Sequence, residues 1–93
     1  MFTGIIETLG RVEAIEKDQR NMHCWISSTI SQELKIDQSV AHNGVCLTVD
    51  ALGEGKHRVT AVAETLQKTQ IGDWQIGSSI NLERCLPMGG RLD

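Results

Sequence analysis

The chain has 93 residues, a formal net charge of -3 and 40% hydrophobic residues, which suits one small domain with a single core. An acidic balance without a basic stripe argues against nucleic acid as a partner, and no apolar run approaches the roughly 20 residues of a membrane-spanning helix. With two Trp, one Phe and no Tyr, a flat ligand would be held by backbone groups and small side chains.

The three cysteines, Cys24, Cys46 and Cys85, are odd in number and widely spaced. They form no C-x-x-C pair, so we expect neither a zinc site nor a disulfide framework. The N-terminus has no basic region followed by an apolar stretch, which argues against a signal peptide. Reduced thiols then favour a cytoplasmic location.

In the first half of the chain, alternating side chains predict a long strand over Gly4–Ile15. Its apolar residues change face near Leu9-Gly10, where we expect a bulge or bend. A polar turn leads to a second strand at Met22–Ser27. Residues 28–34 favour one helical turn. The apolar residues expected to face the core from this region are Ile30, Leu34 and Ile36.

The second half predicts short strands around Ser39–Ala41 and Val45–Leu52, and a glycine turn then leads into His57–Ala63. A brief helix at Glu64–Thr69 and a loop precede the last strand, Ser79–Leu86. Six closely spaced strands with one or two short helical segments predict an all-β fold, a small closed antiparallel barrel. We expect this barrel to occupy residues 1–86, and residues 87–93 to begin a linker.

The most informative stretch is Ser39–Asp50, in which Asn43-Gly44 predicts a tight turn. Beyond the turn, side chains alternate, so Cys46, Thr48 and Asp50 share one face and the valines and leucine between them share the other. A thiol and a hydroxyl on one face could line the rim of a pocket. The alternative is ordinary: free cysteine is commonly buried, and threonine is common in strands.

For other polar residues too, a role in ligand binding and a purely structural role are both open. His42 lies beside the turn, and is either a pocket residue or a structural hydrogen-bond donor. We expect His23 and His57 to be exposed strand residues. Glu64-Thr65 either offers a ligand the free N–H groups of a helix start or is simply a helix start. The chain has no G-x-G-x-x-G, Walker, H-E-x-x-H or nucleophile-elbow motif, so nothing here predicts a cofactor.

Four short motifs in this order resemble the N-terminal half of riboflavin synthase, and the resemblance covers essentially the whole chain. The motifs are Met1–Ile5, Ser39–Val49, Glu64–Leu66 and Asn81–Arg84. The resemblance implies a six-stranded Greek-key barrel, two of which make up the enzyme, usually a homotrimer. That enzyme converts two molecules of 6,7-dimethyl-8-ribityllumazine into riboflavin and a pyrimidinedione by moving a four-carbon unit, without a cofactor or metal.

The resemblance also implies site residues. Catalytic positions would be Ser39, His42 and Cys46. Substrate-binding positions, many of them acting through the main chain, would be Gly4, Ile5, Ile6, Cys46, Leu47, Thr48, Thr60, Ala61, Val62, Ala63, Glu64 and Thr65. In the family the active site forms where the N-terminal barrel of one subunit meets the C-terminal barrel of another. We therefore expect this chain to bind lumazine or riboflavin, to pair as a homodimer, and to have negligible activity by itself.

Two other classes of function stay open at this point. One is a non-catalytic lumazine or flavin carrier of the same fold, against which the retained Ser39–Val49 motif argues. The other is an interaction module, which no motif supports. Turnover by the full-length protein separates the enzyme from the carrier, and failure to bind any pteridine or flavin would favour the interaction module.

Overall fold

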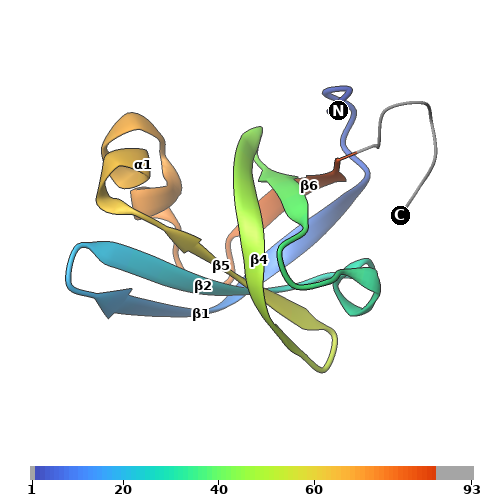
Figure 1. Cartoon of the computed structure of the whole chain (residues 1–93), viewed down its shortest axis with the longest axis horizontal. Coiled ribbons are helices and arrows are strands. Elements are labelled where there is room, and N and C mark those ends of the chain that lie inside the picture. Colours follow the sequence, from blue (N-terminus) through green and yellow to red (C-terminus); the bar gives the residue numbers. More distant parts are fainter. Residues whose placement is uncertain (1, 86–93) are drawn as a thin grey trace.

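The computed structural model describes residues 2–85, which form a closed antiparallel barrel of strands in the order β1-β2-β5-β4-β3-β6 (Figure 1). The strands are β1 (Thr8–Asp18), β2 (Asn21–Ser27), β3 (Ser39–His42), β4 (Val45–Gly53), β5 (Lys56–Ala61) and β6 (Ser79–Arg84). The all-β barrel prediction is confirmed. Because β3, β4 and β5 are successive neighbours and β5 lies beside β2, the connection is a Greek key. The predicted linker, residues 87–93, and the predicted strand end at Leu86 lie outside the described residues.

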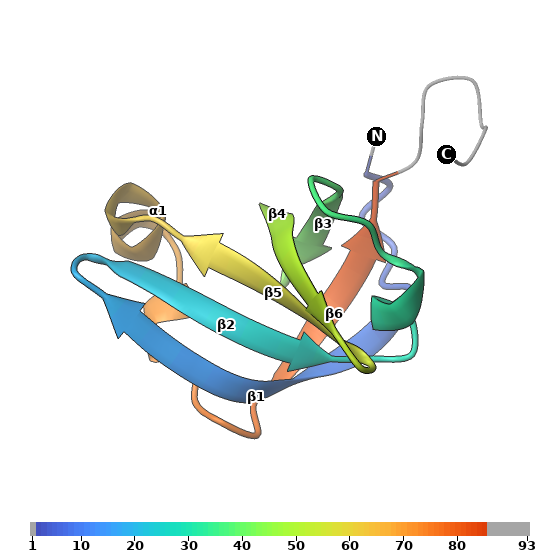
Figure 2. The same ribbon diagram turned by 60° about the horizontal axis from the view of Figure 1, so that its bottom comes forward.

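Three short helical segments complete the chain: η1 (Ser31–Glu33), α1 (Ala63–Lys68) and η2 (Ile71–Asp73). Figure 2 shows α1 and η1 at opposite ends of the barrel. Ile30 and Leu34 beside η1, and Ile71 and Trp74 of the η2 segment, are buried and belong to the hydrophobic core. The prediction that Ile36 faces the core is wrong, because its side chain is 50% exposed.

The core follows from the alternation of side chains along each strand. Every strand contributes inward residues, and the aliphatic ones that are at most 1% exposed are Val12, Ile26, Val40, Val49, Val59, Ile80 and Leu82. The outward positions between them carry the charged and small polar side chains. The polar side chains that could contact a ligand therefore lie on the outer surfaces of the strands, and packing in the barrel interior fixes the positions of those strands.

The predicted bend in the first strand lies farther along the chain than expected. The pairing of β1 with β2 shifts between Val12 and Ala14, and this bulge changes the face on which the apolar residues lie. Gly10 has a different role. A Cβ atom there would lie 2.7 Å from Ile26 Cγ2 and 2.8 Å from Leu82 Cδ1, so a side chain at this position would force these neighbours to shift.

Candidate ligand-binding cleft

The barrel has an opening between β4 and β5. The two strands pair from Gly53 and Lys56 only as far as Val49 and Val59. Beyond this point β4 continues to Val45 along β3, while β5 continues to Ala61 along β2. Figure 1 shows the two strands diverging, with α1 following β5. The backbone edges of residues 45–48 and 60–61 are therefore not paired with each other.

A cavity of about 380 Å³ lies at this end of the barrel, between the β3–β4 turn and the segment from α1 to η2. The residues that line it are His42, Asn43, Val45, Lys68, Thr69, Gln70, Ile71, Asp73 and Trp74. Val45 begins the unpaired part of β4, so the cavity adjoins the opening. Trp74 was missed in the sequence, because it lies in a loop between two glycines and no periodic pattern marks it as buried.

On one side of the opening, predicted site residues gather on the outer face of β3 and β4. Ser39 is paired with Thr48, and Ala41 with Cys46, so these side chains share a face. Thr48 and Cys46 are exposed and Ser39 is half-buried. Leu47 points into the core, being 6% exposed, and can offer a ligand only its backbone. A thiol and two hydroxyls thus lie together beside a free strand edge.

The other side of the opening is the stretch from Thr60 to Thr65. Thr60 is half-buried and Val62 is 50% exposed, whereas Ala61 points into the core. Ala63 and Thr65 are half-buried in α1. The Glu64 carboxylate accepts a hydrogen bond from Lys68 Nζ at 2.8 Å, on the exposed surface of the helix. The outward groups available to a ligand from β5 are accordingly the Thr60 hydroxyl, the Val62 side chain and the backbone.

Such an arrangement can bind a flat heterocycle that carries both donors and acceptors. Backbone N–H and C=O groups are strong hydrogen-bonding groups, and those on an unpaired strand edge are available to a partner. Two such edges lie on opposite sides of the opening, with small side chains and the apolar Val62 around them. This agrees with the sequence argument that a planar ligand must be held without stacking aromatics.

The cysteines differ in their accessibility. Burial raises the pKa of the Cys24 thiol to about 11, so this core cysteine is inert as a nucleophile. Cys46 is exposed beside the opening and is the accessible thiol there. Within residues 2–85 Cys24 and Cys46 form no disulfide, and no group of three or more His, Cys, Asp or Glu side chains gathers as a metal site.

The N-terminal segment is an arm along β6, although a strand was predicted from Gly4. The Glu83 carboxylate accepts hydrogen bonds from the Thr3 N–H at 2.5 Å, the Thr3 hydroxyl at 2.7 Å and the Gly4 N–H at 3.0 Å. Bonds to the Thr3 hydroxyl and then the Thr3 N–H lower the pKa of Glu83. Glu7 is paired in the same way with Arg84, which lowers the Glu7 pKa.

The arm reaches a second cavity, of about 270 Å³, and not the opening between β4 and β5. Gly4 and Ile6 line this cavity together with Asn43-Gly44 of the β3–β4 turn. Ile5 is 71% exposed. The two cavities share only Asn43, whose backbone N–H donates to the Asn81 carbonyl at 2.8 Å. Gly4 and Ile6, both predicted to bind substrate, therefore line a separate hollow beside this turn, whereas Thr60–Thr65, also predicted to bind substrate, line neither cavity.

His42 and His57 are both completely buried and bonded to each other. Their Nε2 atoms are 3.0 Å apart, and burial lowers the pKa of His42 to about 3 and that of His57 to about 4. His42 Nδ1 donates to the Val40 carbonyl at 3.0 Å. The prediction that His57 is exposed is wrong: it has the same parity along β5 as the inward Val59 and Ala61. His42, predicted as catalytic, has the environment of a core residue.

One proton arrangement satisfies this buried chain. Since His42 Nδ1 donates, its Nε2 accepts from His57 Nε2–H, and His57 Nδ1 accepts from the Ser31 hydroxyl at 2.7 Å. The Ser28 hydroxyl donates in turn to Ser31 Oγ at 2.7 Å. Both rings are neutral: a proton added to His42 Nε2 would face the His57 N–H, and one added to His57 Nδ1 would face the Ser31 hydroxyl proton.

No helix in the described part of the chain has the length and hydrophobicity to cross a membrane.

Comparison with known proteins finds a family model and curated relatives that match nearly the whole chain. The family described as "Lumazine binding domain" matches residues 3–85. The chain is 38% identical over 93 residues to the riboflavin synthase of Bacillus subtilis (strain 168), covering 99% of this chain and 43% of that protein. The riboflavin synthase of Brucella abortus (strain 2308) is 39% identical over 98 residues, covering 99% and 48%. The chain thus spans about half the length of these relatives.

Solved structures show the same fold. The crystal structure of LumP complexed with riboflavin superposes with a TM-score of 0.88 at 23% identity, covering 99% of this chain and 50% of that one. LumP complexed with 6,7-dimethyl-8-(1'-D-ribityl) lumazine superposes with a TM-score of 0.87 at 22% identity, covering 100% and 52%. The family match over 83 residues and the identity with riboflavin synthases agree, and the chain belongs to the lumazine-binding domain family.

Proposed function

We propose that this chain is the N-terminal half of a riboflavin synthase and that it binds 6,7-dimethyl-8-ribityllumazine and riboflavin. The observation that carries the proposal is the identity of 36–39% with riboflavin synthases across 99% of the chain. In the complete protein, two lumazines would exchange a four-carbon unit to give riboflavin and a pyrimidinedione. Lumazine and riboflavin are substrate and product here, and the proposal includes no cofactor.

The opening between β4 and β5 is the proposed ligand site. Its two unpaired strand edges would hydrogen-bond the pyrimidine ring of the ligand, and Val62 would cover the ring. The Thr48 hydroxyl would bond a ring heteroatom. Cys46, the exposed thiol of the opening, would lie close to the reacting carbon, and Ser39, opposite Thr48, would contact the ligand from β3.

Replacing Thr48 by Val tests the binding part of the proposal. We expect riboflavin to show a saturable change in fluorescence with the wild-type chain. Thr48→Val should weaken binding by about 0.5–1.5 kcal/mol, because one hydrogen bond is lost while the shape is kept. Thr29→Val changes an exposed threonine at the η1 end and should bind as the wild type does. Equal affinity of all three chains would show that Thr48 does not contact the ligand.

The alternative is a lumazine or flavin carrier of the same fold. The exposed Cys46 beside the opening favours the enzyme, because a carrier has no use for an accessible nucleophile there. Riboflavin formation by the full-length protein decides between the two: turnover establishes the enzyme, and tight binding without turnover establishes the carrier. We propose a cytoplasmic location for either protein, consistent with the free thiols of Cys24 and Cys46.

We also propose that this chain alone forms a homodimer, that the full-length enzyme forms a homotrimer, and that the chain alone has negligible activity. Ile5, Ile6 and Leu9 are each more than half exposed along the arm and the start of β1. Exposed apolar side chains of this kind favour association, and two-fold pairing is the commonest arrangement of identical subunits. Turnover needs one lumazine as donor and the other as acceptor, and groups from a second barrel would distinguish them.

Sedimentation measures the proposed association. We expect a dimer at high micromolar concentration, and a shift toward monomer in Leu9→Glu, because a charge would be buried in the contact. Ile76→Glu places the same charge on another exposed side chain, which is 68% accessible, and should leave the dimer intact. A monomeric wild-type chain at this concentration would contradict the proposal.

A further inference from the structure

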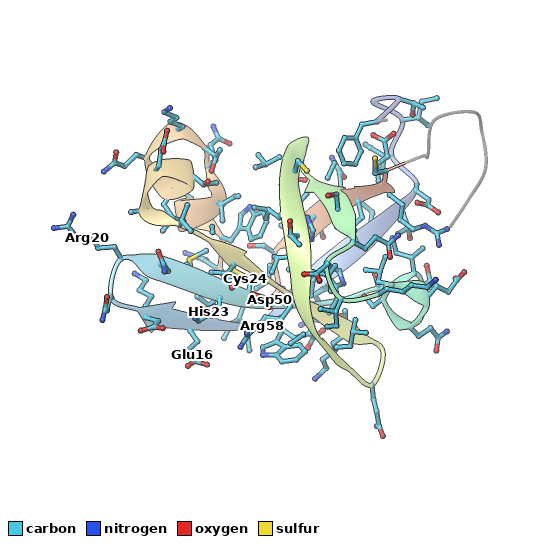
Figure 3. The ribbon with its side chains drawn as sticks, in the orientation of Figure 1. Glu16, Arg20, His23, Cys24, Asp50 and Arg58 are labelled. Carbon is cyan, nitrogen blue, oxygen red and sulfur yellow. The ribbon has the colours of Figure 1, made fainter. Side chains whose placement is uncertain are left out.

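A network of polar side chains crosses the outer surface at the position where β4 and β5 separate. The pairing of β4 with β5 shifts between Val49 and Ala51, so Asp50 is the extra residue of a bulge next to the last pair, Val49 and Val59. Figure 3 shows Asp50 and Arg58 near each other, with His23 of β2 beside them. None of these three residues was assigned to the site from the sequence.

The contacts join four strands, β1, β2, β4 and β5. Asp50 Oδ1 accepts a hydrogen bond from Arg58 Nε at 2.7 Å, and Asp50 Oδ2 accepts one from the Thr60 hydroxyl at 2.5 Å. Thr60 Oγ1 lies 2.6 Å from His23 Nδ1. His23 Nε2 in turn lies 3.5 Å from Asp18 Oδ2 at the end of β1. Asp50 is thus the link between the β4 bulge and two outward residues of β5.

The donor and acceptor of each bond can be assigned. A carboxylate only accepts, so the Thr60 hydroxyl gives its single proton to Asp50. The Thr60 oxygen must then accept from His23, which places a proton on His23 Nδ1. This direction excludes His23 as a base that activates Thr60. The chain of bonds orients the Thr60 hydroxyl and does not make it a nucleophile.

We propose that Asp50 is a positioning residue for the ligand cleft. By bridging Arg58 and Thr60 it fixes the distance between β4 and β5 at the point where the cleft begins, and it orients Thr60, the first cleft residue of β5. Asp50 acts through these residues and does not itself contact the ligand. The inference rests on the proposed function, since the ligand is lumazine or riboflavin in the opening.

Asp50→Asn tests the inference with a signature that loss of stability would not produce. The amide oxygen must face the Arg58 donor, so the amide N–H₂ faces Thr60 and donates to it. The Thr60 hydroxyl then donates to His23 Nδ1, and the His23 proton moves to Nε2. We expect nitrogen NMR at about pH 8 to show a proton on Nδ1 in the wild type and on Nε2 in the variant.

The same variant should bind riboflavin about tenfold more weakly, because the strand spacing and the Thr60 hydroxyl are no longer fixed by a charged bridge. Glu54→Gln neutralises an exposed carboxylate in the adjacent β4–β5 turn and should change neither the His23 proton nor the affinity. If Asp50→Asn does not fold, Thr60→Ser and Thr60→Val replace it: the serine should keep wild-type affinity and the valine should lose it.

Three results would overturn the inference. An unchanged His23 proton in Asp50→Asn would show that the bridge is not formed as described. A transferred proton with wild-type affinity, or equal affinity of Thr60→Ser and Thr60→Val, would show that the bridge does not position the cleft. Absence of riboflavin binding by the wild-type chain would overturn both the inference and the proposed function. This outcome differs from failure of the Asp50 bridge, because the His23 proton would still move from Nδ1 to Nε2 in Asp50→Asn.

Discussion

Acidification from pH 6.5 to about pH 5 is expected to lower the free energy of unfolding by about 3 kcal/mol, chiefly through His42 and His57. Burial holds their pKa values at about 3 and about 4 in the folded chain, below the ordinary 6.5. In the unfolded chain each ring takes up a proton as the pH falls through 6.5, whereas the folded chain keeps both neutral. Their contribution is therefore present above this pH, is lost below it, and levels off once the folded rings also protonate.

This loss is measurable because few other groups titrate in the same range. The carboxylates with lowered pKa, Glu7 and Glu83, affect stability only at lower pH. Denaturant unfolding at a series of pH values gives the slope, which should approach about 2.7 kcal/mol per pH unit for two protons. His57→Gln keeps a donor toward His42 but cannot titrate, so the slope should fall by about half.

His23→Gln is the matched control, because His23 lies on the outer face of β2 and contacts neither buried ring. It should leave most of the pH dependence unchanged. Stability that does not vary between pH 6.5 and about pH 5 would mean that the two buried rings are protonated or accessible in the folded chain.

Replacing Gly10 by Ala is expected to lower the free energy of unfolding by about 1–3 kcal/mol, the usual cost of overpacking a core. The added methyl group would overlap Ile26 and Leu82, and both side chains are completely buried. It would also lie 3.3 Å from the Ser27 carbonyl oxygen, which is fixed in β2. The smaller unfolded-state entropy of alanine offsets only part of this, about 0.4–1 kcal/mol.

Gly72→Ala is the control for this substitution. Gly72 is exposed in η2, and a Cβ there would meet nothing within 4 Å. Its stability should equal or slightly exceed that of the wild type in the same thermal or denaturant unfolding experiment. A Gly10→Ala chain as stable as Gly72→Ala would show that β1 can move away from β2 and β6 at little cost.

Most of the barrel could be predicted because alternation determines which side chains face inward. The face shared by Cys46, Thr48 and Asp50, and the opposite face of buried residues, follow from this period alone. His57 was misassigned because its polarity was given more weight than its parity with Val59. The alternation of side chains along β5 predicts an inward His57. Its hydrogen bond to His42 offsets the cost of burying a polar imidazole.

The cleft could not be predicted from alternation, because it depends on where strand pairing stops. The opening exists because β4 and β5 pair only up to Val49 and Val59, and pairing between strands is a property of the whole barrel. Trp74 closes the barrel end from a loop, without periodicity. The Asp50 bridge depends on a bulge that shifts the register by one residue, which composition and spacing do not indicate.

The most direct test of the proposed cleft is to follow the backbone amide NMR signals of the chain during titration with riboflavin. The account predicts saturable shifts concentrated at the facing strand edges, residues 45–48 and 60–65, with little change at the distant η1 segment, Ser31–Glu33. Smaller shifts in Thr48→Val at the same ligand concentration, chosen below saturation, would support the Thr48 hydrogen bond to the ligand. The absence of saturable shifts would contradict the proposed cleft between β4 and β5. Shifts centred on the open hollow around Trp25 and Lys56 would contradict it as well.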